Sequence, residues 1–181
     1  MRILQIINSL ETGGAEKLIL DTIPHYVKAG IKMDLLLFWD DDQPFVKALR
    51  ALDCCNIIIL KTSSNKKDIY SPGHIFKLKK ILKNYDIAHV HLFPAQYFAV
   101  FAKMLSGAAT KLVFTEHNTT NRRIQNKLFK PVERFIYSKY HKLVCITEEI
   151  VEIYARYLGS KDKLALIHNG VDLSKIKTAV R

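Results

Sequence analysis

The opening of the chain constrains the fold more than any other stretch. Residues 3–7 form a short apolar run that stops at Asn8. A polar loop then closes on Gly13 and Gly14, and a helical period begins at Ala15. A strand, a glycine turn and a helix in this order form the first unit of a doubly wound α/β fold, in which this turn usually meets a phosphate. Glycines let a ligand come close to the backbone, and the N–H groups of the following helix point at that gap.

The alternation of strands and helices continues along the chain. Apolar runs predict further strands at residues 32–39, 56–60, 86–91, 111–115, 143–146 and 164–167. Amphipathic periods predict helices at residues 15–29, 45–52, 73–84, 94–106, 121–140 and 147–158. In the helix at 121–140, the side chains expected to face inward are Leu128, Val132, Phe135 and Ile136. Short connections predict a Rossmann-like, doubly wound parallel sheet of about seven strands with helices on both faces.

The composition fits one such domain with a negatively charged partner. Of the 181 residues, 49% are hydrophobic and 25% charged, as in an ordinary globular domain. The net charge of +11 favours acidic lipid, phosphorylated substrates or nucleic acid. Basic residues gather on the predicted helices 73–84 and 121–140, which are either solvated faces or surfaces held against anionic phospholipid. Nucleic acid is disfavoured, because no recognised reading motif appears.

The sequence also predicts where the protein acts. No segment approaches the roughly 18 apolar residues of a membrane span, and the first residues lack the order of a signal peptide. Cys54, Cys55 and Cys145 suit neither a disulfide framework nor a zinc site. We therefore expect a cytoplasmic protein, with peripheral contact at the inner face of the membrane as the further expectation from the basic helices.

Polar residues follow several of the predicted strands. The carboxyl ends of parallel strands meet at one edge of the sheet, where ligands bind. The residues expected there are Asn8, Gly13, Gly14, His91, Glu116, His117, Asn118, Thr147, Glu148, Asn169 and Gly170. Among them, His117 beside Glu116 could act as an acid or base or hydrogen-bond a ligand. The alternative is a histidine whose hydrogen bonds are satisfied within its own loop.

Other chemistry is disfavoured by what the motifs lack. The glycine pair has neither the G-x-G-x-x-G spacing of a dinucleotide site nor the Gly-Lys-Ser/Thr of a phosphate-binding P-loop. His89 and His91 share one face of a strand, but no third ligand with suitable spacing is evident. We therefore expect no metal and no bound cofactor.

Four stretches, taken together, resemble a known family. They are Gly13-Gly14-Ala15-Glu16, residues 87–91, Thr115-Glu116-His117 and residues 167–172 (Ile-His-Asn-Gly-Val-Asp). In this order they are similar to the N-terminal half of the retaining glycosyltransferases of family 4, which have the GT-B fold. The resemblance implies two Rossmann-like domains that face each other across a cleft, the N-terminal one for the acceptor and the other for most of the nucleotide sugar.

The resemblance also assigns roles to residues. Gly13 and Gly14 would lie near the donor diphosphate, and His117 would contact the donor sugar in the cleft. The other polar residues at the edge would line the acceptor side of the cleft. Residues 1–170 would form the acceptor-side domain, with Asn169 and Gly170 at the hinge, and residues 171–181 would begin the linker to a donor-binding domain.

The implied activity is that of a hexosyltransferase. It would move a sugar from a nucleotide-sugar donor to a glycan or lipid-linked acceptor, in cell-surface polysaccharide synthesis and without a metal. The chain ends at Arg181, before the family's donor-side Arg, Lys and paired glutamates. Because those cations stabilise the leaving diphosphate, we expect this fragment alone to be inactive. Two alternatives stay open: a non-catalytic module that docks on anionic membrane or a partner, and the N-terminal half of a nucleotide-sugar epimerase.

Overall fold

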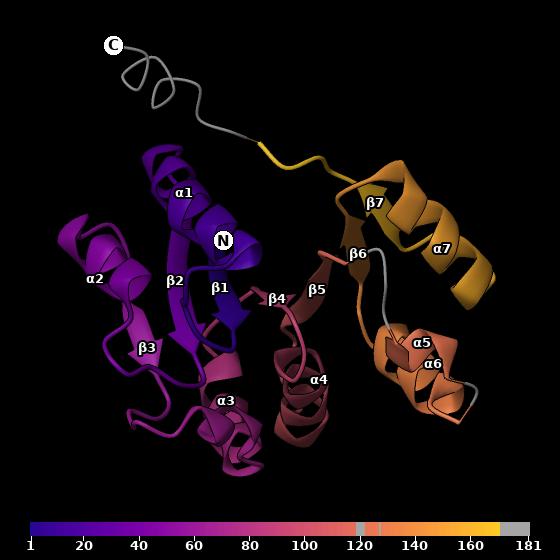
Figure 1. Ribbon diagram of the computed structural model, residues 1–181, viewed down its shortest axis with the longest axis horizontal. Helices are drawn as coiled ribbons and strands as arrows, with labels where there is room; N and C mark the ends of the chain where they lie inside the picture. Colours follow the sequence, from indigo (N-terminus) through magenta and orange to yellow (C-terminus); the bar gives the residue numbers. More distant parts are fainter. Residues whose placement is uncertain (119–121, 127, 171–181) are drawn as a thin grey trace.

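The structure is a computed structural model that describes residues 1–118, 122–126 and 128–170 (Figure 1). Its centre is one sheet of parallel strands in the order β3-β2-β1-β4-β5-β6-β7. The strands are β1 (Arg2–Ile7), β2 (Lys32–Leu37), β3 (Ile57–Ile59), β4 (Ile87–His91), β5 (Lys111–Glu116), β6 (Lys142–Cys145) and β7 (Leu164–Leu166). The predicted doubly wound, Rossmann-like parallel sheet is therefore confirmed.

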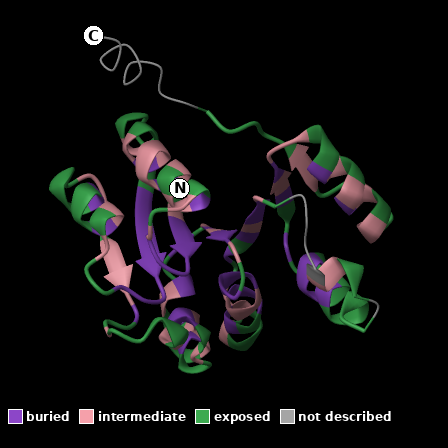
Figure 2. Ribbon diagram, viewed as in Figure 1, coloured by how far each residue is buried: buried purple, intermediate pink, exposed green. Residues whose placement is uncertain are grey.

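Helices cover both faces of the sheet and bury most residues of its inner strands, whereas the edge strands β3 and β7 are not buried (Figure 2). The helices are α1 (Gly14–Lys28), α2 (Pro44–Ala51), α3 (Gly73–Leu82), α4 (Ala95–Ser106), α5 (Arg122–Gln125), α6 (Lys130–Ser138) and α7 (Glu148–Leu158), with a 3₁₀ helix at Lys66–Tyr70. Helices α1 and α2 form one apolar cluster with alternate residues of β1 and β2, such as Ile7 and Leu35. Helices α3, α4, α6 and α7 form the second cluster on the opposite face. The two clusters follow from right-handed crossovers whose direction reverses after β3.

The region predicted as one helix at residues 121–140 is different in the structure. It contains two helices, α5 and α6, and Pro131 lies in the first turn of α6, where a proline is tolerated. Three of the side chains expected to face inward are exposed: Leu128 by 86%, Val132 by 45% and Phe135 by 40%. Only Ile136 is buried as predicted.

The physical reason lies in which residues of α6 pack. The helix buries Glu133, Ile136 and Tyr137, which share one stripe at spacings of three and four residues. Glu133 belongs to that stripe because its carboxylate pairs with Arg123 at 2.8 Å. A stripe drawn through apolar residues alone is therefore rotated away from the true one.

Two further predictions concern a membrane span and the linker at the end of the chain. None of the helices among the described residues combines the length and the hydropathy that crossing a bilayer requires. The predicted linker at residues 171–181 lies outside the described residues.

Candidate functional site

The order of the strands reverses between β1 and β4. Strands β2 and β3 follow on one side of this pair, and β5 to β7 follow on the other. Such a switch point opens a crevice beyond the carboxyl ends of the strands. Asn8 follows β1, His91 ends β4 and His117 follows β5, so the structure brings these three predicted residues to one edge.

Asn8 holds this edge together. Its side-chain amide donates to the carbonyl of Phe93 at 2.7 Å, and its side-chain oxygen accepts from the backbone N–H of Ala95 at 3.1 Å. Its own carbonyl accepts from the backbone N–H groups of Phe38 and Trp39. The side chain is buried and its bonds are used within the protein. Asn8 therefore braces the loops after β1, β2 and β4 against one another.

The glycine pair stands at the N-terminus of α1, where the side chain of Glu16 lies against Gly13. Gly13 caps the helix in an extended conformation, with φ of −112°, so positive φ is not why glycine stands there. A Cβ at Gly13 would lie 2.2 Å from an Oε atom of Glu16, whereas a Cβ at Gly14 would meet nothing within 4 Å. The Glu16 side chain therefore folds back over Gly13, and burial raises the pKa of that carboxyl. A carboxylate therefore lies beside Gly13 at the N-terminus of α1, while Gly14 stays open.

His117 stands on a buried row of polar side chains. Its Nε2 lies 3.0 Å from Nδ1 of His91, and Nε2 of His91 lies 2.8 Å from the side-chain oxygen of Gln5. Burial is the main cause that lowers the pKa of His117 to about 4. Burial likewise lowers the pKa of His89 to about 4 and that of His91 well below its usual value. All three rings are therefore neutral near pH 7. His117 itself is partly exposed, and no described residue bonds its Nδ1.

Glu116 points away from His117. Successive residues of a strand face opposite sides of the sheet, and the Glu116 carboxylate enters the core between α6 and α7. It accepts hydrogen bonds from the hydroxyls of Tyr154 and Tyr137 and from the backbone N–H of Asn118 at 3.2 Å. Burial raises its pKa. Glu116 thus supports the loop that carries His117, and the two side chains do not form an acid–base pair.

The remaining predicted residues lie along the same edge. Thr147 caps α7 by accepting from the backbone N–H of Ile150 at 3.3 Å, and Glu148 is exposed in the first turn of that helix. Asn169 and Gly170 are exposed and border a cavity of about 310 Å³ whose lining includes His89 and His91 but not His117. Its other walls come from α1, including Leu18 and Thr22, and from β6 and the segments after β6 and β7, including Val144 and Ile167.

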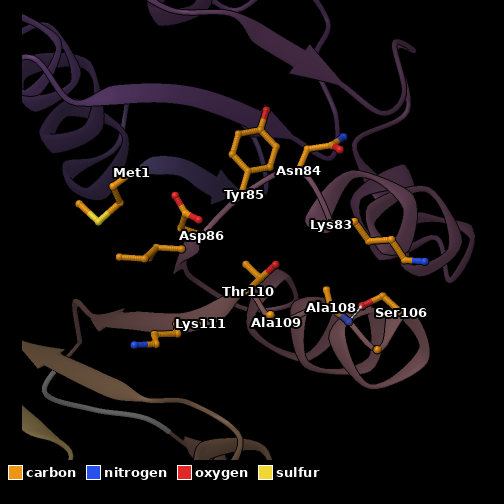
Figure 3. Close-up of a pocket in the computed structure, with 12 residues that line it drawn as sticks. Met1, Lys83, Asn84, Tyr85, Asp86, Ser106, Ala108, Ala109, Thr110 and Lys111 are labelled. Atoms are coloured by element: carbon orange, nitrogen blue, oxygen red, sulfur yellow. Dashed lines mark hydrogen bonds between the residues drawn. The ribbon is translucent and has the colours of Figure 1, made fainter.

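A larger hollow, of about 750 Å³, opens at the opposite edge of the sheet (Figure 3). It is lined by residues that precede β4 and β5, among them Tyr85, Asp86 and Thr110. These groups are committed within the protein: Tyr85 donates to Asp34 at 2.7 Å, Asp86 accepts from the backbone N–H of Arg2 and Thr110 donates to the carbonyl of Leu82. We therefore place the candidate site at the carboxyl edge.

Gln5 and Thr115 belong to the buried row of polar side chains that includes His117, although neither is among the site residues predicted from the sequence. Nε2 of His89 is hydrogen-bonded to the hydroxyl of Thr115 at 2.7 Å. The Gln5 amide lies between the rings of His89 and His91 and is within hydrogen-bond distance of both. A signal was present, because Gln5 is the one polar residue in the apolar run of residues 3–7. Among the described residues, no three His, Cys, Asp or Glu side chains converge where they could hold a metal ion.

Comparison with known proteins agrees with this architecture. The model of glycosyltransferase family 4 matches residues 12–175. No curated protein sequence matches the chain. Among solved structures, HepE from Anabaena, in complex with UDP and glucose, superposes with a TM-score of 0.72 at 18% identity, covering 99% of this chain and 50% of HepE.

Two further structures share the fold. A glycosyltransferase from Rickettsia africae ESF-5 has a TM-score of 0.70 at 22% identity, covering 99% of this chain and 46% of its own. A UDP-N-acetylglucosamine 2-epimerase has a TM-score of 0.65 at 12% identity, covering 93% and 48%. The chain spans about half the length of the structures it matches, so it corresponds to one half of a GT-B fold. At these identities the likeness shows the fold, which transferases and epimerases share.

Proposed function

Because this chain belongs to glycosyltransferase family 4, we propose that it is the acceptor-side domain of a retaining glycosyltransferase. The intact enzyme moves a hexosyl group from a nucleotide sugar to a glycan or lipid-linked acceptor, without a metal or another cofactor. HepE was crystallised with UDP-glucose, which supports a UDP-sugar as the first donor to test. WaaB, a lipopolysaccharide outer core galactosyltransferase of the same fold, supports a place in cell-surface polysaccharide synthesis.

One observation carries this proposal above the others. A partly exposed, neutral imidazole stands at the carboxyl end of β5, close to the switch point between β1 and β4. Sugar rings present hydroxyl groups, and a neutral imidazole hydrogen-bonds a hydroxyl with either of its nitrogens. We propose that His117 makes this contact with the transferred sugar, and that Gly13 and Gly14 flank the donor diphosphate.

The test is His117→Ala in the intact enzyme, with transfer from UDP-glucose measured at several acceptor concentrations. Loss of one well-placed hydrogen bond costs about 1–3 kcal/mol, so kcat/KM should fall by roughly 10- to 100-fold. The matched control is His141→Ala, which removes an exposed imidazole before β6, at the other edge of the sheet. Equal activity of the two variants would exclude the contact.

An epimerase is the second candidate, since a UDP-N-acetylglucosamine 2-epimerase shares the fold. The intact protein given donor alone separates the two. An epimerase changes the sugar of the donor without an acceptor, whereas a transferase forms its glycoside only when an acceptor is present. A non-catalytic module would do neither.

We also propose that α3, α4 and α6 rest on an anionic membrane. Helix α4 contacts both α3 and α6 on one face of the sheet. The outer stripes of these helices carry large exposed apolar side chains: Phe76, Phe101, Met104, Leu105, Val132 and Phe135, with Leu128 just before α6. Exposed lysines and arginines such as Lys77, Lys80, Lys130 and Arg134 lie among them.

The exposed charges of these three helices are all positive. The only carboxylate within α3, α4 and α6 is Glu133, which is fully buried and paired with Arg123. Helices α1 and α7, by contrast, carry acidic residues in their first turns. Apolar side chains ringed by cations and free of exposed anions fit a surface of acidic phospholipid.

Sedimentation with lipid vesicles tests this contact. We expect the chain to bind vesicles that contain phosphatidylglycerol, to release them as salt rises, and to ignore pure phosphatidylcholine. Leu128→Glu removes an apolar contact and adds a repelled charge, so binding should weaken by about ten-fold or more. The control, Tyr26→Glu, makes the same kind of change on the exposed side of α1. Equal binding by both variants would place the contact elsewhere.

A further inference from the structure

We propose that Gln5 and His91 are positioning residues that hold His117 as its Nε2–H tautomer, so that the bare Nδ1 accepts a hydrogen bond from a ligand hydroxyl. The identity of the ligand rests on the proposed function. The tautomer is a property of this chain and can be measured without any activity.

A continuous row of hydrogen-bonding side chains lies on one face of the sheet. The row runs from His117 to His91, Gln5, His89 and Thr115, across strands β5, β4 and β1. The distances between successive polar atoms are 3.0, 2.8, 3.4 and 2.7 Å. The rings of His89 and His91 lie 4.4 Å apart between centroids, and those of His91 and His117 lie 5.3 Å apart.

Each contact in the row holds one proton. A neutral imidazole has one N–H and one bare nitrogen, and burial keeps all three rings neutral. If both Nδ1 of His91 and Nε2 of His117 carried a proton, the two N–H groups would repel each other. If neither carried one, no hydrogen bond could form between them. One of the two nitrogens must therefore be protonated and the other bare. The choice at one ring therefore fixes the choice at the next. Only two orders satisfy the whole row, one with every histidine as Nε2–H and one with every histidine as Nδ1–H.

Met33 selects between these two orders. The side-chain nitrogen of Gln5 lies 3.8 Å from the sulfur of Met33 as well as 3.4 Å from Nδ1 of His89. A thioether sulfur can only accept, so the donating NH₂ group belongs on that side of the amide. The Gln5 oxygen then faces His91, and since an amide oxygen only accepts, His91 must carry its proton on Nε2.

The tautomer of His117 follows from this. With Nδ1 of His91 bare, Nε2 of His117 donates inward, and its own Nδ1 is left as an acceptor. An acceptor nitrogen bonds a hydroxyl or an N–H group, and it is repelled by phosphate and carbonyl oxygens, which also accept. His117 therefore selects a hydroxyl of the sugar rather than an oxygen of the diphosphate. The reverse order would leave His117 with an Nδ1–H donor, which bonds a phosphate oxygen as readily as a hydroxyl and so would not discriminate between them.

Nuclear magnetic resonance reads the tautomers directly. In the chain labelled with ¹⁵N-histidine at neutral pH, long-range proton–nitrogen spectra distinguish a protonated ring nitrogen from a bare one. We expect His89, His91 and His117 all as Nε2–H. Finding His117 as Nδ1–H, or as an even mixture, would overturn the inference whatever the enzyme does.

Two variants test the role of Gln5. Gln5→Met keeps an unbranched side chain of similar size but removes the amide oxygen, so His91 and His117 should lose their single tautomer. Thr115→Val removes the hydroxyl at the opposite end of the row from His117. In this variant His117 should stay in the Nε2–H tautomer. A single Nε2–H tautomer of His117 in Gln5→Met would show that Gln5 does not position it. If Gln5→Met fails to fold, the wild-type spectrum and Thr115→Val still decide the order of the row.

The same measurements separate this inference from the proposed function. An Nε2–H tautomer together with full transfer activity in His117→Ala would leave the row intact and remove its assigned ligand. An Nδ1–H tautomer together with a loss of transfer in His117→Ala would overturn the inferred order of the row and would still support the contact between His117 and the sugar.

Discussion

The histidine row links the chemistry of single residues to the acid stability of the domain. His89, His91 and His117 are neutral because burial disfavours their charged forms. In the unfolded chain the same rings titrate near 6.5, so the unfolded state binds more protons at mildly acidic pH. These histidines therefore have no effect on the free energy of unfolding above about pH 6.5, and they lower it as the pH falls from 6.5 toward about 4.

We expect the free energy of unfolding of this chain, measured in urea, to fall between pH 6.5 and pH 4. A pKa lowered from 6.5 to about 4 corresponds to roughly 3 kcal/mol for one histidine at most. Glu116 offsets part of the loss, because its pKa is raised in the fold. His117→Gln should flatten the pH dependence. Unchanged stability from pH 7 to pH 5 would contradict neutral buried rings.

Glu16 is a second residue whose position makes a prediction. Its carboxylate folds over Gly13 at the N-terminus of α1, where a phosphate would otherwise bind. Glu16→Gln should therefore tighten the binding of inorganic phosphate by about two- to five-fold, as expected for one charge worth about 0.3–1 kcal/mol near a helix end. Shifts of the Gly14 amide signal during titration give the affinity.

Glu149→Gln is the control for that change. Glu149 is an exposed acidic residue in the first turn of α7, and its removal alters the net charge equally. If both variants change phosphate binding at Gly14 alike, the effect is one of overall charge, and Glu16 does not guard the helix end.

At the scale of elements, one ion pair joins α5 to α6. Arg123 on α5 lies 2.8 Å from Glu133 on α6, and its guanidinium stacks 4.3 Å from the centre of the Phe93 ring. The hydroxyl of Tyr97 on α4 also donates to Glu133. Three elements therefore meet at a carboxylate that is fully buried.

Glu133→Gln should destabilise the chain strongly. Removing one partner of a buried pair leaves the other charge uncompensated and costs about 3–5 kcal/mol, toward the lower figure here since Arg123 is partly exposed. Urea unfolding measures the change. The control is Glu152→Gln, which breaks an exposed pair with Lys161 at 2.7 Å and should cost less than about 1 kcal/mol. Equal losses would mean that the α5–α6 junction is held by packing alone.

The same junction shows what the sequence could predict about elements. Strands were placed within a few residues because runs such as Leu35-Leu36-Leu37 are buried on both sides and need no knowledge of their partners. The rotation of α6 could not be predicted, because it depends on Glu133 being neutralised by a residue ten positions away. Likewise, Gln5 gains meaning only when β4 brings His89 and His91 beside it.

At the scale of the whole molecule, the alternation of strands and helices along the chain is enough to predict a parallel sheet. The parallel sheet in turn predicts that ligands bind at the edge formed by the carboxyl ends of its strands. Asn8, His91 and His117 meet there as expected, since parallel strands put their carboxyl ends together. Which side chains face a ligand was beyond such reasoning. Asn8 and Glu116 turn inward to hold loops, and only neighbours distant in sequence, such as Phe93 and Tyr154, determine that.

The charges at this edge lead to the final prediction, that the isolated chain does not turn over a nucleotide sugar. Lys61, Lys66 and Arg123, in the segments that follow β3 and β5, are already paired with Asp68, Glu11 and Glu133, respectively. Departure of a diphosphate requires cations or donors aimed at the developing charge. The glycine loop offers α1 amides that Glu16 partly covers.

Chromatography of UDP-glucose incubated with this chain and an acceptor should therefore show neither free UDP nor a glycoside, whereas the intact protein should form both if the proposed function is correct. A well-dispersed spectrum of the labelled chain serves as the control that it is folded during the assay. Release of UDP by the chain alone, abolished in His117→Ala, would mean that this edge supplies the stabilising charge by itself. The paired cations would then have to exchange partners when the donor arrives.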